Sequence, residues 1–229
     1  MASHLDLEEQ EQLDSLKHFW KTYGNLISWV LIAVFGSIAA MNGWQYWQRT
    51  QATKASALFE EVERAVLAGD LARAEQRFTD IRDKYGSTAF AQQAGLVVAQ
   101  AAADQGKTDV ARSALNWVAD KASDEGLQAV ARLRLAGLLI EAKSYDEALK
   151  QLAADVPDEF TALVADRRGD IYNLQGKKDQ AKAEYSKAYQ ILDERAEYRR
   201  LLEVKLTALG VDPKSLAAPN AKAGGSAKS

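Results

Sequence analysis

The sequence predicts an all-helical protein, with a single N-terminal transmembrane helix followed by a solenoid of helical hairpins. Two observations carry this prediction. Residues 22–48 contain no charged side chain, and the chain after them repeats a turn residue, an alanine and a large apolar residue at a fixed spacing. A third observation restricts the function, because the 229-residue chain has no cysteine and both of its histidines precede residue 22.

The uncharged segment 22–48, between Lys21 and Arg49, has the length and composition of one membrane span. About 20 apolar residues cross the hydrocarbon of a bilayer as a helix. Trp20 and Trp44 would lie about 36 Å apart on a helix that rises roughly 1.5 Å per residue. This separation suits two aromatic belts at the membrane interfaces, and it argues against the alternative of a buried helix in a soluble core.

Residues 1–21 form an acidic N-terminal tail. We expect residues 1–16 to be solvated and disordered, and a partner-docking segment with weak helicity is the alternative. A cleaved signal peptide starts with basic residues, and here the apolar run also continues past the small-x-small site at Ser37–Ala39. We therefore expect an uncleaved anchor. Lysine and arginine are balanced on its two sides, so the positive-inside rule gives no orientation.

Small residues spaced four apart within the span predict a face on which another helix can pack closely. Such residues also occur in spans without this role, so both interpretations stay open. The residues of the predicted packing face are Ala33, Gly36, Ser37, Ala40 and Gly43.

Residues 49–209 are expected to form one domain of tetratricopeptide-like helical hairpins. Four units begin at residues 69, 106, 143 and 176, so they are spaced by 37, 37 and 33 residues. The period of a tetratricopeptide repeat is roughly 34 residues, although a general array of antiparallel hairpins is an alternative. The defining residues are Gly69, Ala74 and Phe78; Gly106, Ala111 and Leu115; Lys143, Ala148 and Leu152; and Gly176, Ala181 and Tyr185.

The residue types fit a hairpin. Glycine accepts the positive φ of a tight turn, alanine allows two helices to approach, and the large residue fills the space between units. Lys143 departs from the turn glycine, and Pro157 is expected to shorten the preceding helix. No proline separates the span from the helix expected over 49–68. Residues 197–209 are predicted to form a capping helix, and residues 210–229 a disordered tail.

The composition argues against catalysis and nucleic-acid binding. The net charge is −3, and no stripe of lysine and arginine follows the chain, so no nucleic-acid partner is expected. Without cysteine or histidine after the span, a hydrolytic triad, a thiol nucleophile and a histidine-based metal site are unavailable there. We expect a protein that is not an enzyme, with no catalytic residue, metal or cofactor.

A solenoid of helical hairpins offers a concave surface that can bind extended peptides or partner helices. The predicted lining of this groove is mixed and weakly acidic. Tetratricopeptide domains that clamp a C-terminal carboxylate resemble each other in having lysine and asparagine at positions where this sequence has Leu96, Leu133, Gln100 and Asp170, so a carboxylate clamp is not expected. The predicted groove residues are Gln93, Leu96, Gln100, Leu133, Gly137, Asp166, Asp170 and Asn173.

Several of these features together resemble the YfgM family of bacterial inner-membrane proteins. They are the acidic tail, Lys17–Trp20, the uncharged span, the Gly43–Trp47 motif followed by Gln51, and the degenerate repeats up to Val211. The resemblance implies an N-terminus in the cytoplasm and a repeat domain in the periplasm. It also implies an ancillary subunit of the SecYEG translocon that works with the chaperone PpiD.

The leading hypothesis is thus a non-enzymatic adaptor that links unfolded, translocating proteins to periplasmic chaperones. Two alternatives come from other functional classes. In one, the acidic tail binds and restrains a cytoplasmic stress-response protein. In the other, the repeat domain is a scaffold for assembly of the cell envelope.

Overall fold

The computed structural model describes residues 7–193 and 195–216, and within these residues every regular element is a helix. The chain divides into two compact units, Met1–Thr53 and Lys54–Ser229, which are described separately here. The prediction of an all-helical fold with one long apolar N-terminal helix is confirmed.

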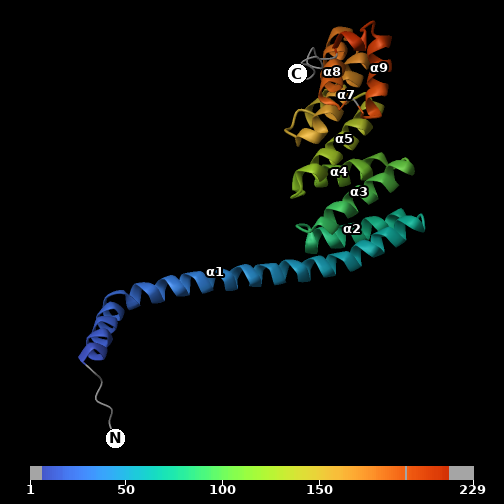
Figure 1. Ribbon diagram of the computed structural model, residues 1–229. Helices are drawn as coiled ribbons and strands as arrows, with labels where there is room; N and C mark the ends of the chain where they lie inside the picture. Colours follow the sequence, from blue (N-terminus) through green and yellow to red (C-terminus); the bar gives the residue numbers. More distant parts are fainter. Residues whose placement is uncertain (1–6, 194, 217–229) are drawn as a thin grey trace, which may run out of the picture. The chain divides into compact units, whose positions relative to one another are not determined.

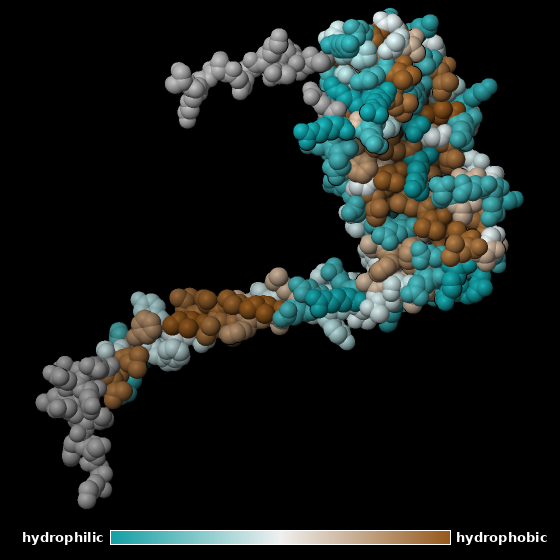
Figure 2. Space-filling model, turned by 45° about the vertical axis from the view of Figure 1, so that its right-hand side comes forward, coloured by the Kyte–Doolittle hydropathy of each residue, from teal (hydrophilic) through white to brown (hydrophobic). Residues whose placement is uncertain are grey.

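The first unit consists of the N-terminal part of helix α1 (Leu7–Leu67). Leu13–Leu67 is the one helix in the described part of the chain that is long and apolar enough to cross a membrane. Only 6% of its most apolar stretch is buried, with a mean hydropathy of 1.8. Figure 2 shows a brown, hydrophobic band along this stretch of the helix. An exposed apolar helix of this length is stable in lipid and not in water, so α1 anchors the protein in a membrane by a single pass.

Helix α1 also has two features that bear on the predicted boundaries. It starts at Leu7, within the expected N-terminal tail, while residues 1–6 lie outside the described part of the chain. It then passes residue 48 without a break. The membrane helix therefore runs directly into the first helix of the repeat domain.

The second unit is a succession of helical hairpins in which consecutive helices pack against each other, as Figure 1 shows. After α1 they are α2 (Leu71–Tyr85), α3 (Ala89–Asp104), α4 (Thr108–Lys121), α5 (Glu125–Glu141), α6 (Tyr145–Gln151), α7 (Asp158–Leu174), α8 (Lys178–Ile191) and α9 (Tyr198–Ala208), followed by the 3-10 helix η1 (Pro213–Leu216).

The four predicted turn residues all adopt positive φ: 73° at Gly69, 71° at Gly106, 57° at Lys143 and 74° at Gly176. Each turn closes with the same pair of backbone hydrogen bonds. At Lys143, its own N–H donates to the Ile140 carbonyl at 2.9 Å, and the next N–H, of Ser144, donates to the Leu139 carbonyl at 2.8 Å. This is the Schellman motif, which ends a helix by satisfying its last carbonyls.

The other residues of the repeat pattern form the core between the helices. All four pattern alanines are fully buried, and the four large residues are at most 5% exposed. Seven of these eight residues, all but Ala111, belong to two clusters. The larger cluster extends from the C-terminal part of α1 to α7, and the smaller one joins α7, α8 and α9. The sequence pattern thus identified the packing positions of the domain.

The second helix of the third repeat is short, as Pro157 predicts. Helix α6 has only seven residues and ends at Gln151, and Pro157 is the N-cap of α7. At the other end of the domain, η1 lies within the segment expected to be disordered, and Leu216 packs partly buried against the smaller cluster. Residues 217–229 of that expected tail lie outside the described part.

Candidate functional site

Three of the predicted groove residues come together in one hollow of the repeat domain. Gln93, Leu96 and Gln100 are spaced three and four residues apart on α3, so they share one face of that helix. The hollow has a volume of roughly 470 Å³. Its other lining residues come from the C-terminal part of α1, from α3 and from α5; they are Phe59, Val66, Val97, Ala101, Asp104 and Arg134.

A second hollow of roughly 160 Å³ adjoins the first, because both are lined by Gln100 and Arg134. It contains the predicted groove residue Gly137, together with Leu138 and Glu141 of α5. We call the two hollows together the α3 groove. Leu133, also on α5, is partly buried and packs against the larger core cluster.

Asp166 and Asp170, which were predicted to line the open groove, instead form hydrogen bonds with α9. Asp166 is 2% exposed, and its carboxylate accepts hydrogen bonds from the Lys205 ammonium at 2.7 and 2.9 Å. Asp170 accepts from the same ammonium at 2.6 Å. Both carboxylates are engaged because the capping helix α9 lies over this part of α7. Asn173, one turn further along, is exposed.

Two tyrosines complete this network. The Tyr198 hydroxyl donates to Asp166 at 2.6 Å, and the Tyr185 hydroxyl donates to Asp170 at 2.8 Å. Burial, followed by these hydrogen bonds to carboxylates, raises the pKa of both tyrosines well above its usual range. The network holds α9 against α7. The sequence signal that could have indicated this network is the pair Tyr198 and Lys205 on α9 together with two aspartates one turn apart on α7.

The predicted packing face of the membrane helix is exposed along its whole length. A Cβ added at Gly36 or Gly43 would meet no atom within 4 Å. The Ser37 hydroxyl donates to the Ala33 carbonyl of the same helix at 2.7 Å, so it needs no partner from another chain. This face can accept a second helix in contact with the backbone.

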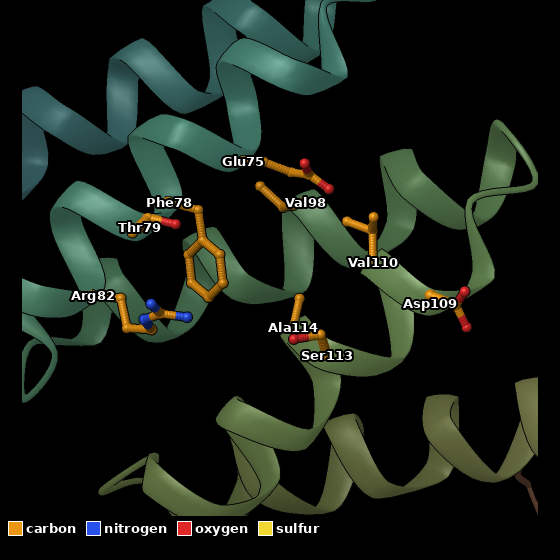
Figure 3. Close-up of a pocket in the computed structure, with 9 residues that line it drawn as sticks. All are labelled: Glu75, Phe78, Thr79, Arg82, Val98, Asp109, Val110, Ser113 and Ala114. Carbon is orange, nitrogen blue, oxygen red and sulfur yellow. The ribbon is translucent and has the colours of Figure 1, made fainter.

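A further hollow, which the sequence did not suggest, lies between α2, α3 and α4 and has a volume of roughly 330 Å³ (Figure 3). The Phe78 ring and the Arg82 side chain project from α2, and Asp109 and Ser113 stand on α4. The Arg82 guanidinium lies 5.9 Å from the Phe78 ring centre and forms an ion pair with Asp83 at 3.0 Å. Its cation thus already has partners within the protein.

Chemically, these surfaces are suited to binding. The described residues contain no group of three or more histidine, cysteine, aspartate or glutamate side chains that could hold a metal ion. Among the described residues, the exposed small-residue face of α1 and the α3 groove are the candidates for contact with a partner. A membrane helix joined to an array of helical hairpins with an open groove defines a membrane-anchored tetratricopeptide-like protein.

Comparison with known proteins identifies the particular family. The family described as "Tetratricopeptide repeat-like domain" matches residues 17–211. A Neisseria gonorrhoeae protein named "Ancillary SecYEG translocon subunit" is 32% identical over 91% of this chain and all of its own length. Proteins of the same name from Haemophilus influenzae and Escherichia coli are 30% and 27% identical over 80% and 76% of this chain, and over 90% and 84% of their own lengths. The chain belongs to this family, the YfgM family, as the sequence motifs predicted.

Proposed function

We propose that this protein is a non-enzymatic ancillary subunit of the SecYEG translocon. The observation that carries the proposal is the similarity over nearly the whole chain to proteins that bear this name. The similarity includes the membrane helix as well as the repeats, since the matched family domain starts at residue 17. Both of the surfaces described above therefore lie within the matched part of the chain.

In the proposed arrangement, the N-terminus lies in the cytoplasm and the repeat domain in the periplasm. The membrane helix docks beside the translocon through its small-residue face. The repeat domain binds a periplasmic chaperone such as PpiD and brings it close to unfolded proteins that leave the translocon. This division fits a chain whose membrane part exposes backbone to a neighbouring helix and whose repeats carry an open groove.

The test is purification of the tagged protein from its own membranes in a mild detergent, followed by mass spectrometry of the proteins that accompany it. A version lacking residues 55–229 is purified in parallel. We expect Sec subunits with both versions and a periplasmic chaperone with the full chain only. Absence of Sec subunits from both preparations would refute the proposal, and envelope-assembly proteins in their place would favour a scaffold.

The docking face has its own test. Gly36→Leu combined with Ala40→Leu fills the small-residue face while keeping the helix apolar. We expect a loss of Sec subunits from the purified sample. Val34→Leu with Ile38→Leu is the matched control, because it changes exposed large residues of the same span. Equal recovery with the Gly36 and Ala40 variant would show that docking uses another surface.

Orientation can be tested on the same protein, since the chain contains no cysteine. Single variants Ala2→Cys and Ser113→Cys place one thiol at the N-terminus and one on an exposed position of α4. A membrane-impermeant maleimide applied to cells with a permeabilised outer membrane should label the thiol at position 113 and not the one at position 2. The reverse pattern would invert the proposed topology.

A further inference from the structure

We propose that the α3 groove binds a short extended segment of unfolded polypeptide that carries large apolar side chains and at least one lysine or arginine. This inference rests on the proposed function, since it specifies what the repeat domain holds. Four features of the groove support it: its apolar floor, its amides, its unpaired carboxylates and its shape.

The floor of the groove is apolar and incompletely covered. Phe59, Val66, Leu96 and Val97 pack against the larger core cluster but each stays partly exposed. Burial of apolar surface stabilises a complex by roughly 25 cal/mol per Å². A hollow of roughly 470 Å³ admits one or two large apolar side chains. The floor thus favours a ligand with such side chains over a polar one.

Two exposed amides frame this floor. Gln93 and Gln100 are separated by about two helical turns on α3, with Leu96 between them. A carboxamide can both donate and accept hydrogen bonds. The backbone of an extended segment has free N–H and C=O groups to pair with it, whereas the backbone of a helix is already paired internally. The amides therefore favour an extended ligand over a helical one.

The charges of the groove select the charge of the ligand. Asp104 and Glu141 line the two hollows, and neither forms an ion pair within the described residues. The Gln100 amide donates to Asp104 at 2.8 Å. Arg134 is the one cation among the lining residues, and it donates to the Leu96 carbonyl at 3.4 Å. The lining thus carries a net negative charge, which complements a lysine or arginine of the ligand.

The two hollows are arranged in sequence, because Gln100 and Arg134 lie at their common border. Side chains on one face of an extended segment recur every second residue, roughly 7 Å apart. One segment can therefore place an apolar side chain in the larger hollow and a further side chain in the smaller one. Unfolded polypeptides supply such segments, whereas a folded partner presents few of them.

The experiment measures fluorescence anisotropy of labelled short peptides with the full chain in detergent micelles. The first peptide combines leucine, valine and phenylalanine with two lysines. The second replaces the lysines by glutamates, and the third replaces the apolar residues by serine. We expect the first peptide to bind more tightly than either of the others. Equal binding of all three, or binding of none, would overturn the proposal.

Two variants locate the binding. Gly137→Leu extends a side chain into the smaller hollow, where a Cβ meets no atom within 4 Å, so the fold is preserved. We expect about tenfold weaker binding of the lysine peptide, the order of effect of one lost apolar contact. Asp104→Lys with Glu141→Lys should reverse the preference between the lysine and glutamate peptides, by a few-fold for each exposed charge pair.

The matched control is Ser113→Leu, which adds the same side chain to an exposed position in the hollow of Figure 3. It should bind the lysine peptide as the unmodified protein does. If Ser113→Leu weakens binding of the lysine peptide as much as Gly137→Leu does, the peptide binds elsewhere and the proposal is overturned. A dimer that forms without peptide and dissociates when the lysine peptide is added would show a second copy as the occupant and would also contradict the proposal.

Recovery of Sec subunits is measured with the same Gly137→Leu protein. Loss of peptide binding with Sec subunits retained supports both the groove and the proposed function. The other outcome is that peptide binding depends on the groove but the protein recovers no Sec subunits. This would support the groove proposal and refute only the translocon proposal.

Discussion

Lys143 shows how the repeat imposes a backbone conformation even where the sequence lacks the preferred residue. It occupies the third turn with φ of 57°, in the same left-handed region as the three glycines that follow α1, α3 and α7, whose φ values are 71–74°. For residues other than glycine this conformation costs about 1–2 kcal/mol. The Schellman hydrogen bonds and the burial of Ala148 and Leu152 behind the turn hold Lys143 there.

Lys143→Gly is therefore expected to stabilise the repeat domain. The gain from relieved strain is offset in part by the greater conformational entropy of glycine in the unfolded chain, which leaves about 0.5–1 kcal/mol. Urea unfolding followed by circular dichroism measures this difference. Gly106→Ala, at a turn with φ of 71°, is the control and should destabilise. A Lys143→Gly protein less stable than the original would show that the lysine side chain contributes to the turn.

Gly169 shows a second kind of constraint, the size of its partner. A Cβ at this position would lie 2.5 Å from the Tyr185 ring. The equivalent positions of the two preceding units hold Ala99 and Ala136, both buried, and there the large residue is a leucine. The larger tyrosine of the last unit thus requires the smaller glycine.

Gly169→Ala is expected to destabilise the domain by about 1–3 kcal/mol because the ring must move. Gly137→Ala is the matched control in a neighbouring helix. It meets no atom within 4 Å and should stabilise by up to about 1 kcal/mol through helix propensity. The thermal unfolding midpoints of the two variants measure these changes in stability. In a double-mutant cycle, Tyr185→Leu should reduce the cost of Gly169→Ala, and strict additivity would contradict the size argument.

At the scale of elements, α9 is held to α7 by polar contacts, and its Leu202 and Leu206 are fully buried in the smaller cluster with residues of α7 and α8. Lys205 supplies one ammonium to two carboxylates, and Tyr198 donates to Asp166. Removing one partner of a buried ion pair costs more than the pair contributes, because an unpaired charge remains. The cap is therefore sensitive to the ionisation of the groups around Asp166.

The raised pKa values of Tyr185 and Tyr198 predict how stability depends on pH. Their folded pKa lies above the unfolded value of 10.0, so their contribution is complete below about pH 10 and decreases as pH rises further. Tyr198→Phe removes one of the two groups, and the loss of stability above pH 10 should become less steep. Tyr145→Phe, on the short helix α6, is the control.

This comparison uses urea midpoints at several pH values between 8 and about 11, measured on the three proteins in parallel. Lysines also titrate in this range, but they are common to all three proteins, so the difference in slope reports the tyrosine. An identical slope for Tyr198→Phe and the unmodified protein would show that the hydrogen bond to Asp166 does not control the ionisation of this tyrosine.

At the scale of the whole molecule, the sequence predicted the anchor, the turns and the packing positions because each depends on local rules. A membrane span, a turn residue at positive φ and a buried alanine can each be predicted from residues that are close together in the sequence. The position of Asp166 and Asp170 could not be predicted in this way. It depends on Lys205, which is 39 and 35 residues away along the chain, and a periodic pattern within α7 contains no information about a helix that covers it.

The predicted α3 groove shows the same distinction. Gln93, Leu96 and Gln100 line one hollow, and their spacing alone puts them on one helix face. Phe59 and Arg134 were not foreseen as their neighbours, since they come from α1 and α5, each two helices away from α3 along the chain. Local periodicity identified one wall of the groove, and the packing of the hairpins supplied the others.

The continuity of α1 leads to a prediction about the two units. Its first buried core residue is Ala55, so the residues just before it belong to the helix but not to the core. Gln51→Pro removes a helical hydrogen bond and disturbs the preceding turn, at a cost of about 3 kcal/mol within a helix. We expect this cost to fall on the helix between the units. The thermal midpoint of the repeat domain should change little, because its core lies beyond the break.

Gln51→Ala is the control for the side chain, and Val62→Pro, at a fully buried position of the same helix, should unfold the first hairpin. If the span and the repeats act as separate units, the Gln51→Pro protein should still recover Sec subunits and a chaperone from membranes. Loss of both in a protein whose repeat domain melts normally would mean that function requires an unbroken helix, and that α1 does more than connect an anchor to a binding domain.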